Sequence, residues 1–222
     1  FRSYFLRKIA GIQVTELKSY DIDSYRDIFC QDDLIIAISQ SGETADTIEA
    51  VEHAKSKGVK VASLVNMQGS TLTRISDYPF LSRSGPEICV ASTKAFTSQI
   101  SWGFLLAMSL ISKHELAHNE IYRISELLEN AFNPTKFVET EKVIQNIVKN
   151  FKDKEHFFVL GKGQNFYIAL EGSLKIKEIT YKHFEGFSAG ELKHGVIALI
   201  EKDTPVIVII SDDEYKEDML SA

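Results

Sequence analysis

Cysteine is scarce in this sequence, in which 222 residues include only Cys30 and Cys89. The two lie far apart in unrelated contexts, so no pair of cysteines has the spacing of a metal-binding motif. A disulfide framework needs more cysteines than two. We therefore expect both thiols to be free, as is usual in the reducing cytoplasm.

Long hydrophobic runs are also absent. The longest apolar run is far shorter than the roughly 20 residues that span a bilayer, and no signal peptide opens the chain. We therefore expect a cytoplasmic protein that does not bind membranes. Basic residues are outnumbered by acidic ones, and the net charge of −6 argues against general binding of nucleic acid. It does not exclude a phosphate ligand, which a few local N–H and hydroxyl donors can hold.

The hydrophobic residues that are present form short runs rich in β-branched and aromatic side chains. Such runs, without polar alternation, are typical of parallel strands that are covered on both faces. The strands predicted in this way are residues 34–38, 59–65, 78–81, 157–160 and 206–210. Pro79 marks the third of them as an edge strand, because proline has no backbone N–H to donate.

Amphipathic helical patterns lie between the predicted strands. Residues 47–57 form one, which ends at Gly58, and residues 92–113 form a long apolar one. A polar helical stretch from about residue 120 to 151 is interrupted at Asn133-Pro134, which predicts a two-helix connector. Strands that alternate with helices predict an α/β fold, with parallel sheets flanked by helices in a three-layer α-β-α arrangement.

A run of hydroxyl side chains follows the first predicted strand and leads directly into a helix. Residues 39–47 read Ser-Gln-Ser-Gly-Glu-Thr-Ala-Asp-Thr. This loop lies at the carboxyl end of a parallel strand, where open α/β sheets bind ligands. Its hydroxyl groups, together with the N–H groups and the dipole of a helix start, suit a phosphate. The loop lacks the lysine of a Walker loop, which favours a single phosphomonoester over a triphosphate.

The same loop has a simpler interpretation. Ser, Thr and Asp are common helix N-caps, so Thr44 or Asp46 could serve only to begin the following helix. Spacing alone does not decide between a cap and a phosphate site.

Three charged side chains lie on one face of a later predicted helix, since Glu171, Lys175 and Glu178 are spaced at i, i+4 and i+7. In one interpretation, Glu171 and Lys175 form a surface ion pair worth about 0.3–0.5 kcal/mol, and Glu178 is a solvated acid. In the other, the Glu178 carboxylate moves a proton between adjacent carbons of a sugar while Lys175 stabilises the negative charge. Helix spacing alone favours the ion pair.

Three blocks of sequence together resemble the sugar isomerase (SIS) family, in the form carried by glucosamine-6-phosphate synthases. The first is the hydroxyl-rich loop of residues 39–47, and the second is residues 87–97, Glu-Ile-Cys-Val-Ala-Ser-Thr-Lys-Ala-Phe-Thr. The third extends from Leu160-Gly161-Lys162-Gly163 to His194-Gly195. The blocks occur in family order, and the resemblance covers nearly the whole chain.

The resemblance implies a role for each matching residue. The substrate-binding residues that it implies are Ser39, Gln40, Ser41, Thr44, Val90, Ser92 and Glu171. The catalytic residues that it implies are Lys175, Glu178 and His194. Glu178 would be the base. His194 would open the sugar ring as a general acid–base group supplied across a subunit interface, which implies a homodimer. We expect surface or packing roles for the other histidines, which are His53, His114, His118, His156 and His183.

The resemblance also divides the chain into two SIS units. The first is residues 1–118 without its opening strand, residues 119–154 are the helical connector, and the second is residues 155–222 without its C-terminal part. The sequence begins without methionine inside a helical pattern and ends just after another helix begins. We therefore expect a fragment that is truncated at both ends.

The activity that the resemblance implies is conversion of fructose 6-phosphate and glutamine-derived ammonia to glucosamine 6-phosphate. It implies no metal or organic cofactor, and the sequence offers no cluster of metal ligands. Three features of the family would lie outside this chain. They are a serine of the first unit's opening loop, a lysine in the C-terminal tail that forms an imine with the substrate, and an N-terminal glutaminase domain.

Two kinds of alternative remain open. A fructosamine-phosphate deglycase or an amino-sugar deaminase/isomerase could use the same frame for a different reaction. A sugar-phosphate sensor would belong to another class, because it would bind its ligand without chemistry. A sensor needs the phosphate loop but neither Glu178 nor His194, so the third block weighs against it.

Overall fold

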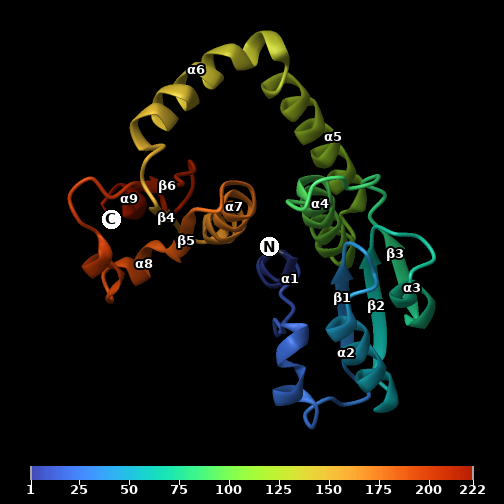
Figure 1. The fold of residues 1–222 in the computed structure, drawn as a ribbon. Helices are drawn as coiled ribbons and strands as arrows, with labels where there is room; N and C mark the ends of the chain where they lie inside the picture. The colour runs from blue at the N-terminus through green and yellow to red at the C-terminus, as the bar shows by residue number, and fades with distance from the viewer. Residues whose placement is uncertain (1, 222) are drawn as a thin grey trace. The chain divides into compact units, whose positions relative to one another are not determined.

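The computed structural model describes residues 2–221. The chain separates into two compact units, Arg2–Ala117 and the residues from His118 onward, each built around its own parallel sheet (Figure 1). The predicted α/β class with parallel sheets flanked by helices is confirmed. Phe1, the first residue of the predicted opening helix, lies outside the described residues.

The first unit contains a three-stranded parallel sheet in the order β1-β2-β3. The strands are β1 (Leu34–Ser39), β2 (Lys60–Val65) and β3 (Tyr78–Leu81). β1 pairs with β2 from Leu34 opposite Lys60 to Ser39 opposite Val65. β3 pairs only with β2 and is therefore an edge strand, as the proline at position 79 predicted.

Helices cover both faces of this sheet. On one face, α2 (Ala45–Ser56) and α3 (Thr71–Ile75) enclose a core of Ala37, Val51, Val61, Val65 and Leu72. On the other, α4 (Thr93–Leu110) places Trp102 against Phe80 of β3, with ring centroids 5.4 Å apart. The N-terminal helix α1 (Arg2–Lys8) packs along α4, and a 3₁₀ segment, η1 (Ser19–Tyr25), lies beside α2.

The second unit contains another three-stranded parallel sheet, in the order β5-β4-β6. Its strands are β4 (His156–Gly161), β5 (His183–Ser188) and β6 (Val206–Val208). β5 was not predicted, and β6 ends two residues before the predicted end. In β5 only Phe184 is buried, and Glu185 and Gly186 interrupt the apolar pattern. Gly186 lies so close to α7 that a Cβ atom there would be 2.7 Å from the carbonyl oxygen of Ala169.

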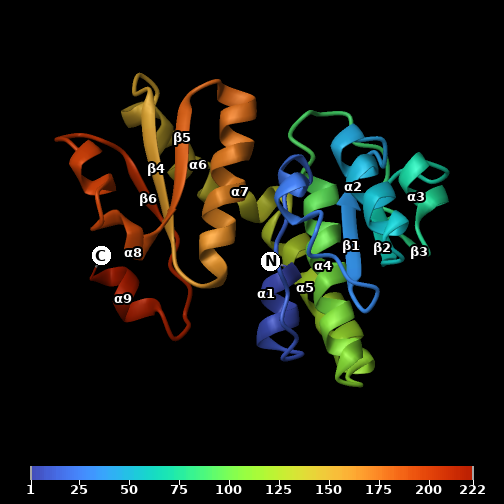
Figure 2. The same cartoon turned by 90° about the horizontal axis from the view of Figure 1, so that it is seen from below.

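Different helices lie on the two faces of β4 (Figure 2). Alternate side chains of this strand belong to two different cores. Phe157 and Val159 pack against α7 (Gln164–Thr180). Leu160 packs on the other face against Leu192 and Met219. That face is covered by α8 (Ala189–Leu192), η2 (Val196–Leu199) and α9 (Lys216–Leu220). β4 is therefore a central strand buried on both faces, as its uninterrupted apolar run predicted.

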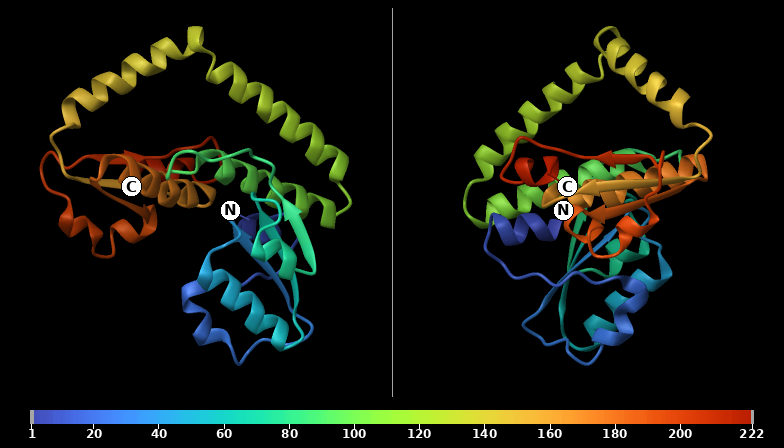
Figure 3. Two further views of the ribbon diagram at one scale, coloured as in Figure 1. Left: turned by 45° about the vertical axis from the view of Figure 1, so that its right-hand side comes forward. Right: turned by 90° about the vertical axis from the view of Figure 1, so that its left-hand side faces the viewer.

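Two long helices precede this sheet, namely α5 (His114–Ala131) and α6 (Pro134–Phe151), which meet at a sharp bend (Figure 3). The break falls at the predicted Asn133-Pro134 pair. Asn133 is the N-cap of α6, and its side chain accepts a hydrogen bond of 3.0 Å from the Thr135 N–H. None of the described helices is long and apolar enough to cross a membrane.

Candidate functional site

The hydroxyl-rich loop joins the end of β1 to α2 and is held together by its own side chains. The Ser39 hydroxyl accepts the Gly42 N–H at 2.9 Å and lies 3.4 Å from the Thr44 hydroxyl. The Ser41 hydroxyl accepts the Glu43 N–H at 3.2 Å. These bonds bend the chain sharply, so the hydroxyl groups gather at the carboxyl end of the strand.

Thr44 occupies the N-cap position of α2, but its side chain makes no capping hydrogen bond. Its backbone carbonyl accepts the Ile48 N–H at 3.0 Å, which begins the helix without help from the hydroxyl group. Thr44 is therefore the N-cap of α2, as the simpler interpretation predicts, but its side chain does not cap the helix, and Asp46 lies inside the first turn. The hydroxyl group is left beside the N–H groups of the first helical turn, where an anion is favoured.

Glu43 is an acidic residue within the hydroxyl-rich loop, and its carboxylate has a structural role there. Its carboxylate accepts the backbone N–H of Thr71, at the start of α3, at a distance of 2.7 Å. This backbone hydrogen bond holds the pKa of Glu43 below its usual value. The Glu43 carboxylate thus links the hydroxyl-rich loop to α3 through this hydrogen bond.

A pocket of about 370 Å³ opens above this loop within the first unit. Six of the predicted substrate-binding residues line it, namely Ser39, Gln40, Ser41, Thr44, Val90 and Ser92. The structure thus brings together two of the three sequence blocks. Glu87 and Cys89 also line the pocket, and neither was predicted as a site residue. Cys30 and Cys89 are both free and exposed.

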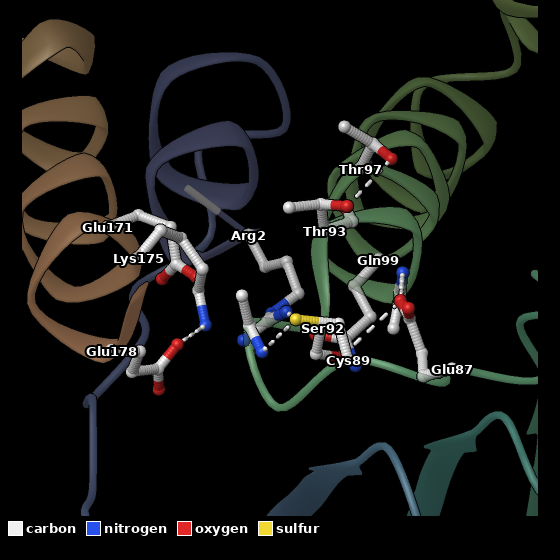
Figure 4. A network of polar contacts seen from close by, with 12 residues as sticks. Arg2, Glu87, Cys89, Ser92, Thr93, Thr97, Gln99, Glu171, Lys175 and Glu178 are labelled. Carbon is white, nitrogen blue, oxygen red and sulfur yellow. Dashed lines mark hydrogen bonds and ion pairs between the residues drawn. The ribbon is translucent and has the colours of Figure 1, made fainter. Parts of the chain in front are cut away.

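Glu87 fixes the part of the pocket that comes from the second block. Its carboxylate accepts the Ala95 N–H at 2.7 Å and lies 3.4 Å from the Ser92 hydroxyl group (Figure 4). Ser92 is the N-cap of α4, and its backbone is left-handed (φ 41°, ψ 61°). A residue with a side chain rarely adopts this conformation unless surrounding contacts hold it there. Glu87 thus supplies the helix cap that Ser92 does not.

The second unit places the predicted charged residues on one face of α7, where all three side chains are partly buried. Lys175 Nζ lies 2.9 Å from Glu178 Oε2 and 3.5 Å from Glu171 Oε1 (Figure 4). The Lys175 side chain is 18% exposed and each glutamate 26%. Lys175 is therefore shared by both carboxylates, and Glu178 is not the freely solvated acid of the simpler interpretation.

Burial opposes the charged form of Lys175, but its two partners outweigh that effect. The hydrogen bond to Glu178 and the negative charges of Glu171 and Glu178 raise the pKa of Lys175 above its usual value. Lys175 therefore stays positively charged at neutral pH, as stabilisation of a developing negative charge requires.

His194 follows α8 in an exposed turn, where its backbone N–H donates to the Glu191 carbonyl at 2.9 Å. In the part of the chain that the structure describes, no hydrogen bond or ion pair joins its ring to Glu171, Lys175 or Glu178. Its exposure is what a side chain donated to a partner subunit would need.

A family profile described as "SIS domain" matches residues 4–109 and 150–222. These two segments make up most of the chain and coincide with the two sheets and their helices. The chain belongs to the SIS domain family. The profile leaves most of α5 and α6 unmatched between its two segments.

Relatives of this SIS chain carry a specific name. The glutamine–fructose-6-phosphate aminotransferase (isomerizing) of Pyrococcus horikoshii is 46% identical to this chain. The alignment is 226 residues long and covers 98% of this chain. A solved structure, the C-terminal domain of glucosamine-fructose-6-phosphate aminotransferase from Francisella tularensis, is 35% identical with a TM-score of 0.77. It aligns with 99% of this chain and 63% of that one.

A second solved structure with the SIS fold carries a different name. The glucosamine-6-phosphate deaminase of Thermotoga maritima is 26% identical with a TM-score of 0.78, over 98% of this chain and 66% of that one.

The present chain spans only about 36% of the length of the curated aminotransferase relative from Pyrococcus horikoshii.

Gly42 offers a test of the SIS loop geometry. It has φ +69°, and a Cβ atom would lie 2.2 Å from Ser70 Oγ and 2.7 Å from Val65 Cγ1. We expect Gly42→Ala to lower the free energy of unfolding by about 1–3 kcal/mol, because a strained backbone and a clash occur together. Urea unfolding of the full-length protein measures it.

Gly69 provides the matched control, since it has a similar φ of +76° but no neighbouring atom within 4 Å of the place that a Cβ atom would take. Gly69→Ala should therefore show the backbone cost alone. Equal losses in the two variants would contradict the close approach of Gly42 to Ser70 and Val65.

Proposed function

We propose that this chain is the sugar-phosphate isomerase part of a glutamine–fructose-6-phosphate aminotransferase. That enzyme would convert fructose 6-phosphate and glutamine-derived ammonia to glucosamine 6-phosphate. The observation that carries the proposal is the half-buried Lys175–Glu178 pair on the SIS frame, because a module that only binds sugar phosphate needs no such pair. The name of the Pyrococcus horikoshii relative, at 46% identity, supports this reaction among those of the family.

Phosphate binding is assigned to the loop after β1. Ser39, Gln40, Ser41 and Thr44 line the pocket there, and the start of α2 adds N–H donors and a favourable dipole. Val90 and Ser92 line the same pocket and are assigned to the sugar. This arrangement holds a single phosphomonoester through hydrogen bonds and needs no metal ion.

Proton transfer is assigned to α7 of the second unit. With the sugar ring open and ammonia attached at C2, the Glu178 carboxylate removes a proton from C1 and returns it to C2. The C2 carbon then carries the amine and C1 becomes the aldehyde, with one water molecule released for each ammonia consumed. Lys175 stabilises the negative charge that develops on oxygen, and Glu171 holds Lys175 beside the substrate.

The remaining assignments concern the assembly. Residues 1–118 and 155–222 are two SIS units, with 119–154 as their connector. Exposed His194 opens the sugar ring in a partner subunit, so the active form is a homodimer. An N-terminal glutaminase domain in the full-length protein supplies the ammonia, in the cytoplasm. Residues outside this chain supply the tail lysine and the opening-loop serine.

A deaminase is the second candidate, because the Thermotoga maritima glucosamine-6-phosphate deaminase has the same fold over 98% of this chain. Product analysis separates the two. The full-length protein, given fructose 6-phosphate and glutamine, should form glucosamine 6-phosphate and glutamate, as NMR can follow. Net release of ammonia from glucosamine 6-phosphate, with no synthesis from glutamine, would favour the deaminase and contradict the proposal.

Glu87 is proposed to position Ser92 and Val90 against the sugar. We expect Glu87→Ala to weaken glucosamine 6-phosphate binding several-fold, since loss of a helix N-cap costs about 0.5–2 kcal/mol. Inorganic phosphate should bind as before, because it contacts only the loop after β1. Calorimetry measures the affinity of each variant for glucosamine 6-phosphate and for inorganic phosphate.

Glu87→Gln is the matched variant, because its amide oxygen can still accept the Ala95 N–H. It should restore most of the sugar-phosphate affinity. If Glu87→Ala weakens both ligands equally, the residue supports the fold of the unit in general and does not position the sugar-binding segment.

A further inference from the structure

Two histidines that are distant in sequence meet at the beginning of the second sheet. His156 opens β4 and His183 opens β5, and the two are register partners in the parallel pair. Their Nδ1 atoms lie 3.2 Å apart, and the rings are nearly perpendicular with centroids 5.2 Å apart. Both side chains are exposed, so solutes reach them.

The backbone under these rings is held firmly. The next register pair, Phe157 and Phe184, is buried, and its rings stack at 4.2 Å. On the other side, the Glu155 carbonyl accepts the His183 N–H at 3.0 Å. Lys182 reaches across to the Lys154 carbonyl at 2.5 Å and the Glu155 carboxylate at 2.8 Å. The backbone therefore keeps His156 and His183 next to each other before any ligand arrives.

The Glu185 carboxylate lies near the outer nitrogen of the His183 ring. Its Oε2 lies 3.6 Å from His183 Nε2, on the opposite side of the ring from Nδ1. With the proton on Nε2, which this carboxylate favours, Nδ1 of His183 accepts the hydrogen bond from His156, and a metal ion would take the place of that shared proton. Metal-binding histidines commonly have such a carboxylate behind them.

The spacing of the two Nδ1 atoms suits one metal ion. At metal–nitrogen distances of about 2.0–2.1 Å, two nitrogens on one ion are about 2.9 Å apart at a right angle and about 3.3 Å apart at the tetrahedral angle. The observed 3.2 Å lies between these values. We propose that His156 and His183 form a binding site for a divalent transition-metal ion that joins the first residues of β4 and β5.

The ion is identified by the chemistry of its ligands. Neutral imidazole suits Cu²⁺, Ni²⁺ and Zn²⁺, with Cu²⁺ bound most tightly, whereas Mg²⁺ and Ca²⁺ prefer oxygen ligands. No group of three or more His, Cys, Asp or Glu side chains within residues 2–221 could hold a metal ion, so water completes the coordination. The site is therefore one of modest affinity, and a bound ion would stabilise the second unit.

Titration of the full-length protein with Ni²⁺, followed by calorimetry, tests the site. The exposed thiols of Cys30 and Cys89 also bind such ions, so binding by the two histidines is identified by comparing variants with the parent. We expect His156→Gln and His183→Gln each to weaken the imidazole site more than about tenfold, and Glu185→Gln to weaken it about tenfold. His118→Gln, which removes an exposed histidine from α5, should change nothing.

Ring NMR signals of the unmutated protein give a second measurement that does not depend on the folding of a variant. Sub-stoichiometric Ni²⁺ should broaden the signals of His156 and His183 before those of the other histidines, and Mg²⁺ should not. Equal Ni²⁺ affinity in the parent and both histidine variants, or broadening that spares these two rings, would overturn the proposal.

Discussion

Glu178→Gln should lower the rate of glucosamine 6-phosphate formation by the full-length protein by about 10²–10⁴-fold, the loss expected for removal of a positioned general base. Glutamine keeps the size of the side chain and an oxygen that can accept the Lys175 hydrogen bond, at present 2.9 Å long. It lacks the basic oxygen that takes a proton from C1. Sugar-phosphate affinity should change little, because the phosphate is held by the loop after β1.

Two measurements together separate catalysis from binding. They are the steady-state rate with saturating fructose 6-phosphate and glutamine, and the sugar-phosphate affinity from calorimetry. Glu129→Gln, on the exposed surface of α5, is the control for a lost carboxylate and should have the parental rate. A Glu178→Gln variant with unchanged rate, or one whose rate loss is explained by weaker binding, would contradict the role of Glu178.

The double variant Ser41→Ala/Thr44→Val should bind glucosamine 6-phosphate more weakly by about 1–3 kcal/mol, which is roughly 5- to 150-fold. Both residues line the pocket, and hydrogen bonds to a charged phosphate are stronger than those between neutral groups. Thr44 makes no capping bond, so its hydroxyl is not required to begin α2. Calorimetry with glucosamine 6-phosphate measures the loss.

Ser56→Ala is the matched control for this second experiment, because it removes an exposed hydroxyl from the other end of α2. Urea unfolding should show similar stability for the double variant and the parent. Unchanged affinity together with lower stability would mean that the loop serves the fold and does not hold phosphate.

The sequence predicted most of the fold because its central strands are buried on both faces. β2 and β4 each have five successive buried residues, and continuous apolar runs mark such strands clearly. β5 was missed because Phe184 is its only buried residue. β5 is placed in the sheet by its pairing with β4 and lies close to α7 at Gly186, and no local pattern reveals such contacts between distant segments.

The candidate site was predictable to a similar extent. The loop of residues 39–47 and the face of Glu171, Lys175 and Glu178 follow from local sequence, because hydroxyl density and helix spacing are visible there. The role of Glu87 was not predictable, since it depends on the backbone conformation of Ser92. The meeting of His156 and His183 depends on the pairing of β4 with the unpredicted β5.

Hydrogen exchange at C1 of fructose 6-phosphate in deuterated water, followed by NMR, tests the central assignment most directly. With glutamine present, the full-length protein should exchange this hydrogen, because a proton held by the Glu178 carboxylate can exchange with solvent. The Glu178→Gln variant should bind the sugar phosphate but exchange the hydrogen at least about 10²-fold more slowly. Exchange by the variant at the parental rate would show that another group moves the proton. Binding of fructose 6-phosphate by the parent in the presence of glutamine without any exchange would contradict the assignment of the chain as an isomerase.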